Sequence, residues 1–519
     1  MLPWLAHGHI SPFLELAKKL IKRNVYIYFC STAVNLSSIK DQISEESFHS
    51  IQLVELHLPS FPDLPPHYHT TKSLPPHLIP TLRKALDMAE PTVSTILKLL
   101  NPHLLIYDFF QPWAPVIASA QNIPAILFNT TGAATFCFSL HHMKNPGVEF
   151  PSPFLHFEEH EIRRNTQLLE SSAGSKDTYR KCIEKSSDII LMKTFREIEA
   201  KYLDYLTVLY EKKPVPVGVL VQDPIYENNQ SEFIQWLSKK EKSSAVFVSF
   251  GSECILKKEE MEEIAHGLEL SSINFIWAIK FPKGEKSRID EALPQGFLER
   301  VGERGMVVEG WAPQTKILQH SSIGGFVSHC GWSSVVEGMR YGVPIIAMPI
   351  HLDQPLNARM AVEIGVGVEV KREKDGRLER GEVAKVIREV VLEKEGEEVR
   401  RKAKEMGGKI GMKGEEEIDV LLEELMLLSR PLSPVVQVTR TVAVPVQEEQ
   451  QGATIAADIV APTQTVVAPT VAAPVSLRRS SRDRRSAMSS DYEVYLNEVA
   501  GGVSFSGEVS PASKHRFSC

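Results

Sequence analysis

Short apolar runs alternate with amphipathic stretches along roughly the first 430 residues. In the first half, runs rich in Val, Ile and Leu predict strands at 25–30, 51–56, 103–107, 125–128 and 188–192. Residues 11–23 place Phe13, Ala17 and Leu20 on one face of a helix, with Pro12 in a first turn that tolerates proline. Residues 59–80 hold many prolines and histidines, which predicts a long irregular loop.

A second alternating series follows a connector at 218–244. Its predicted strands are 245–250, 275–279, 306–309, 325–328, 345–348 and 367–370, and its predicted helices are 258–270, 314–319, 334–341, 356–364 and 380–393. Strands that alternate with helices form parallel sheets covered on both faces. We therefore expect an α/β protein with two facing Rossmann-like domains, 1–217 and 245–429, and a ligand cleft at the carboxyl ends of their strands.

Composition narrows the function classes. The 519 residues are 43% hydrophobic and 24% charged, which is ordinary globular usage, and a net charge of −7 gives no basic field for nucleic acid. The six scattered cysteines form no C-x-x-C pair and suit a reducing compartment. No apolar run reaches the roughly 18 residues of a membrane span, and no signal peptide is evident, so we expect a cytoplasmic protein.

The last segment, 430–519, has a different composition. Prolines interrupt runs of Val, Ala and Thr, which predicts a disordered tail outside the enzyme. The arginine cluster at 478–485 leaves open an alternative function in nucleic-acid binding, although the near-balanced charge of the tail disfavours it.

A polar cluster follows the strand predicted at 325–328. The glycine turn at Gly331 leads into a helix that we expect to start near Trp332, and a helix N-terminus offers free backbone N–H groups to an anion. His329 and Ser334 add side-chain donors there, which suits a diphosphate. Glu337 could accept hydrogen bonds from a ribose, although Ser334 and Glu337 also fit a capping box, a purely structural alternative.

Polar and aromatic residues flank the neighbouring strand ends. Trp311 offers a flat indole that could stack on a base, and Gln314 lies beside it. Asp353 and Gln354 follow the strand predicted at 345–348 and could hold sugar hydroxyls. Each signal is weak alone, but together they form an ordered set across 311–354.

This stretch resembles the signature box of plant family 1 UDP-dependent glycosyltransferases, which have the two-domain GT-B fold. The resemblance covers roughly 1–429 and implies that Trp311 stacks on uracil, that Gln314 and Glu337 contact ribose, and that Gln354 accompanies UDP-glucose. The donor-contacting positions that it implies are Ser252, Trp311, Ala312, Gln314, His329, Gly331, Trp332, Ser333, Ser334, Glu337, Asp353 and Gln354. Ser333 departs from the usual Asn and resembles the branch that adds a second sugar to an existing glycoside.

The resemblance also implies the catalytic pair. His9 aligns with the family's catalytic histidine, and Asp108, at the end of the strand predicted at 103–107, matches its partner aspartate. A histidine held by a carboxylate can take a proton from an acceptor hydroxyl. Without the box, His9 would be interpreted as a structural histidine at a helix N-terminus. His7 is interpreted as a neighbour of the site, and 109–113 as core or acceptor wall.

The expected reaction is direct displacement on UDP-glucose, the donor co-substrate, with no other cofactor and no metal, giving a β-glucoside. We predict a monomeric glucosyltransferase whose acceptor is a flavonoid, terpenoid or apocarotenoid glucoside. Direct glucosylation of an aglycone such as a flavonol or cytokinin is the alternative. An inactive chain is another, because Met1–Trp4 supply little of the first strand and unpaired backbone in a central strand is costly. The tail resembles a copia-type retrotransposon polyprotein segment, which suggests a fused and truncated locus or an imperfect gene model.

Overall fold

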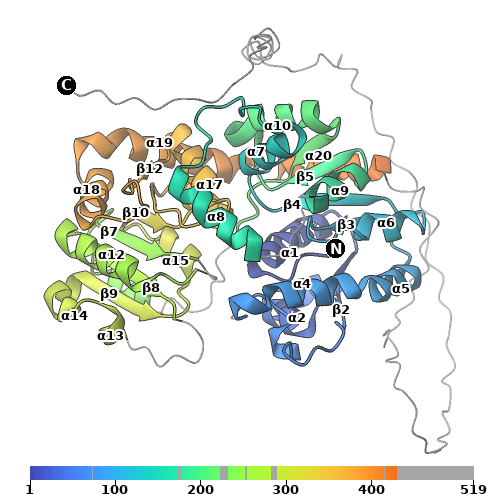
Figure 1. The fold of residues 1–519 in the computed structure, drawn as a ribbon, viewed down its shortest axis with the longest axis horizontal. Helices are drawn as coiled ribbons and strands as arrows, with labels where there is room; N and C mark the ends of the chain where they lie inside the picture. Colours follow the sequence, from blue (N-terminus) through green and yellow to red (C-terminus); the bar gives the residue numbers. More distant parts are fainter. Residues whose placement is uncertain are drawn as a thin grey trace, which may run out of the picture. The chain divides into compact units, whose positions relative to one another are not determined.

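The computed structural model describes residues 1–72, 74–171, 177–222, 232–251, 254–281, 289–413 and 415–428. The predicted donor contact Ser252 and the predicted tail at 430–519 lie outside these residues. The prediction of α/β architecture is confirmed, because parallel sheets alternate with helices along the described chain (Figure 1). None of the described helices combines the length and apolar character needed to cross a membrane.

The first half contains two parallel sheets. One pairs β1 (Ile27–Ser31) with β2 (Ile51–Glu55), and the other has the order β3-β4-β5-β6. The strands of the second sheet are β3 (Leu105–Tyr107), β4 (Ala125–Asn129), β5 (Ile189–Met192) and β6 (Lys213–Pro216). Strand β6 was not predicted from the sequence, because two of its four residues are prolines. Proline is tolerated in this position because β6 is an edge strand.

Met1 and Leu2 join the two sheets of the first half. The Leu2 amide donates to Ile106 O at 2.8 Å, and Leu2 O accepts from the Asp108 amide at 3.2 Å. On the other side, Met1 O accepts from the Cys30 amide at 3.0 Å. The two residues thus supply a short strand between β1 and β3, and part of the backbone that we expected to be unpaired is paired.

The helix after this short strand begins earlier than predicted. Helix α1 spans His7–Ile21, so His9 lies in its first turn and Pro12 lies inside it. The predicted start at residue 11 is therefore wrong. Pro12 has no N–H to donate to Gly8 O, but the local amides of His9 and Ile10 already bond to Ala6 O and start the helix upstream.

The other helices of the first half and of the connector lie around these sheets. They are α2 (Ala33–Lys40), α3 (Glu45–Phe48), α4 (Ile79–Met88), α5 (Glu90–Leu100), α6 (Ala114–Ser119), α7 (Ala133–Lys144), α8 (Glu159–Ser171), α9 (Asp177–Lys185), α10 (Arg196–Tyr210) and α11 (Glu232–Leu237). The loop predicted at 59–80 holds two short 3₁₀ turns, Pro66–Tyr68 and Pro76–Leu78.

The second half holds one six-stranded parallel sheet of order β12-β11-β10-β7-β8-β9. Its strands are β7 (Ala245–Ser249), β8 (Asn274–Ile279), β9 (Gly305–Glu309), β10 (Ile323–Ser328), β11 (Ile345–Ala347) and β12 (Gly367–Glu369). All six were predicted to within two residues, since buried parallel strands consist of nearly continuous apolar runs. The sheet is covered by apolar side chains on both faces, among them Trp277 and Phe326.

Helices cover both faces of this sheet, and α12 and α18 pack on each other beside β7 (Figure 1). From residue 258 onward the helices are α12 (Lys258–Ser271), α13 (Ile289–Ala292), α14 (Phe297–Val301), α15 (Gln314–Gln319), α16 (Trp332–Tyr341), α17 (Gln354–Glu363), α18 (Arg380–Val391), α19 (Glu397–Lys413) and α20 (Glu416–Leu428), the last of which packs elsewhere. Helix α20 packs with α1 and β6 in the core of the first half, through Ile418, Leu421 and Leu425.

Candidate functional site

His9, in the first turn of α1, meets Asp108 at the carboxyl end of β3. His9 Nδ1 lies 2.7 Å from Asp108 Oδ2, and the Asp108 side chain is fully buried while that of His9 is 19% exposed. The other Asp108 oxygen accepts a hydrogen bond from the Phe110 amide at 3.3 Å. The carboxylate therefore fixes the ring through Nδ1, and the geometry leaves Nε2 as the nitrogen that could exchange a proton with a substrate.

Aromatic rings surround this histidine. The ring centroids of Phe109 and Phe110 each lie 5.5 Å from that of His9, and Trp4 stacks on Phe110 at 4.7 Å. Trp113 instead packs into the interior and donates its Nε1–H to Asp87 at 3.0 Å. The segment 109–113 is thus divided between the wall beside His9 and the core.

Thr130 is a neighbour of His9 that was not predicted from the sequence. Its hydroxyl lies 3.1 Å from His9 Nδ1, on the same nitrogen that Asp108 holds. Thr130 directly follows β4, and this position at the carboxyl end of a central strand could have indicated that Thr130 belongs to the site. His7, two residues before His9, is exposed.

His329 follows β10 and is half-buried beside two glycines, with its Nδ1 atom shielded from solvent. A Cβ atom at Gly251 would come within 2.5 Å of His329 Nε2, and one at Gly331 within 2.7 Å, so only glycine leaves room for this ring. Gly251 also has a φ of +80°. Burial lowers the pKa of His329 to about 3, with a smaller effect from His351 and Lys280. The imidazole is therefore neutral at physiological pH and can take part in a hydrogen bond without adding charge.

The helix after His329 starts as predicted at Trp332, with Gly331 as its N-cap. The capping-box alternative for Ser334 and Glu337 is wrong, because Ser334 lies inside the first turn and no side chain caps the helix. The amides of this first turn are therefore not used by a side-chain cap.

The two predicted ribose residues contact each other. Gln314, the first residue of α15, donates through Nε2 to Glu337 Oε2 at 2.7 Å and to Ser334 Oγ at 3.3 Å. Burial raises the pKa of Glu337, while the hydrogen bond from Gln314 and the charge of Lys193 lower it. Close by in the sequence, Trp311 is 76% exposed and Ala312 is buried. The indole is thus free of the core and accessible for stacking.

Asp353 and Gln354 lie where the loop after β11 meets α17, as its N-cap and its first residue, but they differ in what their side chains contact. Asp353 Oδ2 accepts from Thr131 Oγ1 at 3.1 Å and from Asn357 Nδ2 at 2.9 Å. Gln354 is buried, and its Oε1 accepts from the amides of Ile350 and His351, each at 3.0 Å. The Gln354 oxygen therefore holds the loop itself, and its amide nitrogen lies 3.5 Å from His351 Nδ1.

Helix α8 from the first half holds the same loop from outside. Arg164 donates through Nη1 to Ile350 O at 2.8 Å. Asn165 makes a reciprocal pair with Leu352: its Nδ2 donates to Leu352 O at 3.1 Å, and its Oδ1 accepts from the Leu352 amide at 2.7 Å. No sequence motif indicated these contacts, which join residues 186 and 187 positions apart.

Further bonds link the first half to the helix after His329. Trp332 donates its Nε1–H to Lys193 O at 2.7 Å, and Lys193 Nζ donates to Ser333 Oγ at 2.8 Å. The backbone of Trp332 is the predicted donor contact, whereas its indole is buried and bonded to the first half.

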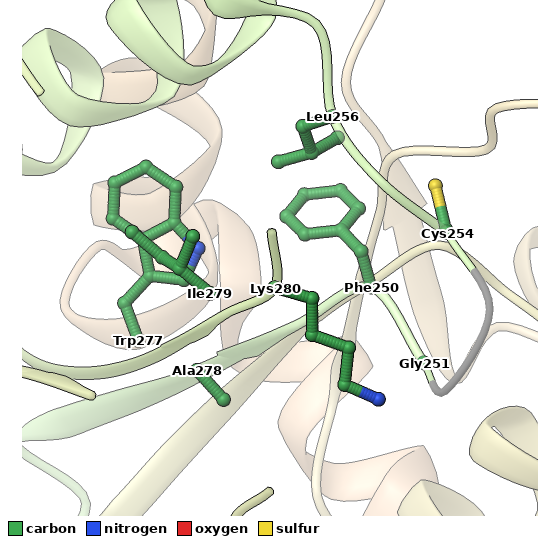
Figure 2. A pocket seen from close by; sticks show the side chains of 8 residues that line it. All are labelled: Phe250, Gly251, Cys254, Leu256, Trp277, Ala278, Ile279 and Lys280. Carbon is green, nitrogen blue, oxygen red and sulfur yellow. The ribbon is translucent and has the colours of Figure 1, made fainter. Parts of the chain in front are cut away.

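A small pocket opens at the carboxyl ends of β7 and β8, lined by Phe250, Gly251, Cys254, Leu256, Trp277, Ala278, Ile279 and Lys280. Figure 2 shows the Lys280 side chain extending toward the Gly251 turn, the same turn that packs on His329. The pocket therefore adjoins the candidate diphosphate site instead of forming a separate one.

A His–Asp pair on one Rossmann-like sheet and a polar helix N-terminus on another define a two-domain group-transfer enzyme of the GT-B class. Family models match along both parts: "Glycosyltransferase, N-terminal domain" over residues 1–218, and "UDP-glucoronosyl and UDP-glucosyl transferase" over 222–398.

Named relatives and solved structures agree with this class. The chain is 56% identical to UDP-glucosyltransferase 29 of Panax ginseng, over 83% of this chain and 96% of that one. It is 51% identical to beta-D-glucosyl crocetin beta-1,6-glucosyltransferase of Gardenia jasminoides, over 82% and 98%. The structure of Phytolacca americana UGT2 with UDP-2fluoro-glucose and pterostilbene matches with a TM-score of 0.65 at 25% identity, over 83% and 99%. The chain belongs to the plant UDP-glycosyltransferase family, and the prediction of that family and of its GT-B fold is confirmed.

Proposed function

We propose that this chain transfers glucose from UDP-glucose to a hydroxyl group of a plant small-molecule glycoside and forms a β-glucoside. The observation that carries the proposal is the 2.7 Å contact between His9 Nδ1 and Asp108 Oδ2 beside an aromatic wall. This pair has the geometry of a general base held by a carboxylate.

In the proposed reaction, His9 Nε2 takes the proton of the acceptor hydroxyl as its oxygen attacks the anomeric carbon of the donor. The bond from that carbon to the UDP oxygen breaks on the opposite face, which inverts the configuration. Asp108 stabilises the imidazolium that forms. The amides of the first turn of α16, with His329 and Ser334, would stabilise the charge on the departing diphosphate.

The other predicted donor contacts fit this scheme. Gln314 and Glu337, which already share a hydrogen bond, would contact ribose, and the exposed indole of Trp311 would stack on uracil. Asp353 and the amide nitrogen of Gln354 would contact the sugar. No metal, and no cofactor besides the donor co-substrate, is part of the proposal.

Relatives support a glycoside acceptor over an aglycone. Their names specify beta-D-glucosyl crocetin, flavanone 7-O-glucoside (Citrus maxima, 48% identical) and cyanidin-3-O-glucoside (Bellis perennis, 45% identical). The transferred sugar differs among these names, being glucosyl, rhamnosyl and glucuronosyl in turn. Glucose is proposed here because of Gln354 and the two glucosyltransferase relatives.

The test is a transfer assay read by mass spectrometry. The full chain is incubated with UDP-glucose or UDP-glucuronic acid and a mixed panel of aglycones and their monoglucosides. The expected result is one hexose added to monoglucosides from UDP-glucose. His9→Ala should abolish it, and the exposed neighbour variant His7→Ala should retain it. Transfer only to aglycones, or activity that survives in His9→Ala, would contradict the proposal. An inactive chain would give no product with either donor.

A further inference from the structure

Lys193 is a buried lysine at the boundary between the two halves of the site. It follows β5, and only 2% of its surface is exposed. Its side chain donates to Ser333 Oγ at 2.8 Å, and its carbonyl accepts the Trp332 indole N–H at 2.7 Å. One residue of the first half therefore holds two consecutive residues in the first turn of α16.

The charges around Lys193 come from two carboxylates. Burial lowers the pKa of Lys193 to about 8, and the negative charges of Glu337 on α16 and Glu15 on α1 act in the opposite direction. In return, the charge of Lys193 lowers the pKa of Glu337. The ammonium group is thus close enough to Glu337 for each to stabilise the charged form of the other.

A diphosphate at α16 needs this compensation. His329 is neutral and adds no positive charge, while Glu337 places a carboxylate on the same helix, one turn beyond its start. An uncompensated carboxylate at that distance would repel the phosphates. Ser333, where the family signature usually has Asn, accepts the hydrogen bond of the ammonium group through its hydroxyl oxygen.

We propose that Lys193 is a donor-positioning residue: its ammonium group holds Ser333 and offsets the charge of Glu337, so that the first turn of α16 accepts the diphosphate of a nucleotide sugar. This inference rests on the proposed function and assigns part of the donor site to the half that carries His9. Donor binding is thereby tied to the contact between the two halves.

The test compares UDP and UMP binding to the full chain by isothermal titration calorimetry, with acceptor kinetics measured in parallel. Lys193→Met keeps the length of the stem and removes the charge, so the buried side chain leaves no cavity. The expected result is an increase of about tenfold in the Kd for UDP, a smaller increase for UMP, and an acceptor KM within about twofold of the parent. The exposed ion-pair variant Lys213→Met is the matched control and should leave the Kd for UDP unchanged.

A second variant, at Ser333, tests whether Lys193 acts through its hydrogen bond to that residue. Ser333→Ala should raise the Kd for UDP, and the double variant should be no weaker than Lys193→Met alone, because both act through one contact. An unchanged Kd in Lys193→Met, an equal loss for UDP and UMP, or a larger effect on the acceptor KM would each overturn the inference. If the parent chain itself fails to bind UDP, the proposed function fails, which is a different result from a parent and a variant that bind equally.

Discussion

The half-buried His329, whose pKa is lowered by desolvation, predicts a specific dependence of stability on pH. Its pKa in the folded chain is about 3, whereas an unburied histidine has a value of 6.5. Between these values the unfolded chain binds a proton that the folded chain does not. The stability that this group contributes is therefore complete above pH 6.5 and is lost as the pH falls from 6.5 toward 3.

The size of the effect follows from that interval. At pH 5.0 the solution is 1.5 units below 6.5, and each unit corresponds to about 1.4 kcal/mol, so His329 should cost the fold about 2 kcal/mol relative to pH 7.5. His329→Gln removes the titrating group while keeping a polar side chain of similar length. The variant should lose about 2 kcal/mol less than the parent between the two pH values.

The assay is urea unfolding of both chains at pH 7.5 and pH 5.0, followed by tryptophan fluorescence. Each chain is compared with itself, so a packing defect that the glutamine introduces beside Gly251 cancels. His49→Gln, at an exposed histidine, controls for the loss of a histidine as such. If the parent and His329→Gln lose the same free energy of unfolding, the folded chain does not hold His329 in the neutral form and the reasoning is refuted.

Three further predictions follow from individual contacts. Asp108→Asn should lower kcat by about 10²–10⁴-fold and leave the KM for UDP-glucose nearly unchanged in initial-rate measurements, because the side chain of Asp108 holds His9 and the Phe110 amide and none of the predicted donor contacts. A rise in that KM with normal kcat would contradict this prediction. Trp332→Phe leaves the buried Lys193 carbonyl without its indole donor, so it should lower the free energy of unfolding by about 1–3 kcal/mol in urea titrations. Unchanged stability would argue against that hydrogen bond. Asn165→Ala should raise the KM for UDP-glucose without changing the Kd for UDP, since it frees only the loop at Leu352; equal changes in both would show that the loop does not act on the sugar.

The fold was predictable to the extent that local patterns determine it. The strands of the second sheet were found because buried parallel strands are continuous Val- and Ile-rich runs. The edge strand β6 was missed because its prolines oppose a strand assignment, and the start of α1 was placed too late because Pro12 resembles a first-turn proline.

The site was predictable where its residues are close in the sequence. The turn at Gly331, the start of α16 and the nearness of Gln314 to Glu337 all lie within one 44-residue stretch, 311–354. The contacts of Thr131 with Asp353 and of Lys193 with Ser333 span 222 and 140 residues. Such long-range pairs depend on how the two halves pack, and no local spacing encodes them.

The hydrogen bonds from α8 to the loop at 350–352 have a consequence for protein engineering. Chimeras of related transferases are naturally joined in the connector at 218–244, on the assumption that each parent's sugar preference travels with its second half. Here Arg164 and Asn165 lie before that junction, yet they hold the backbone beside Asp353 and Gln354. A chimera that exchanges the first half would also exchange Arg164 and Asn165, and with them these hydrogen bonds. The intended donor preference should therefore be recovered by transplanting α8 together with the second half.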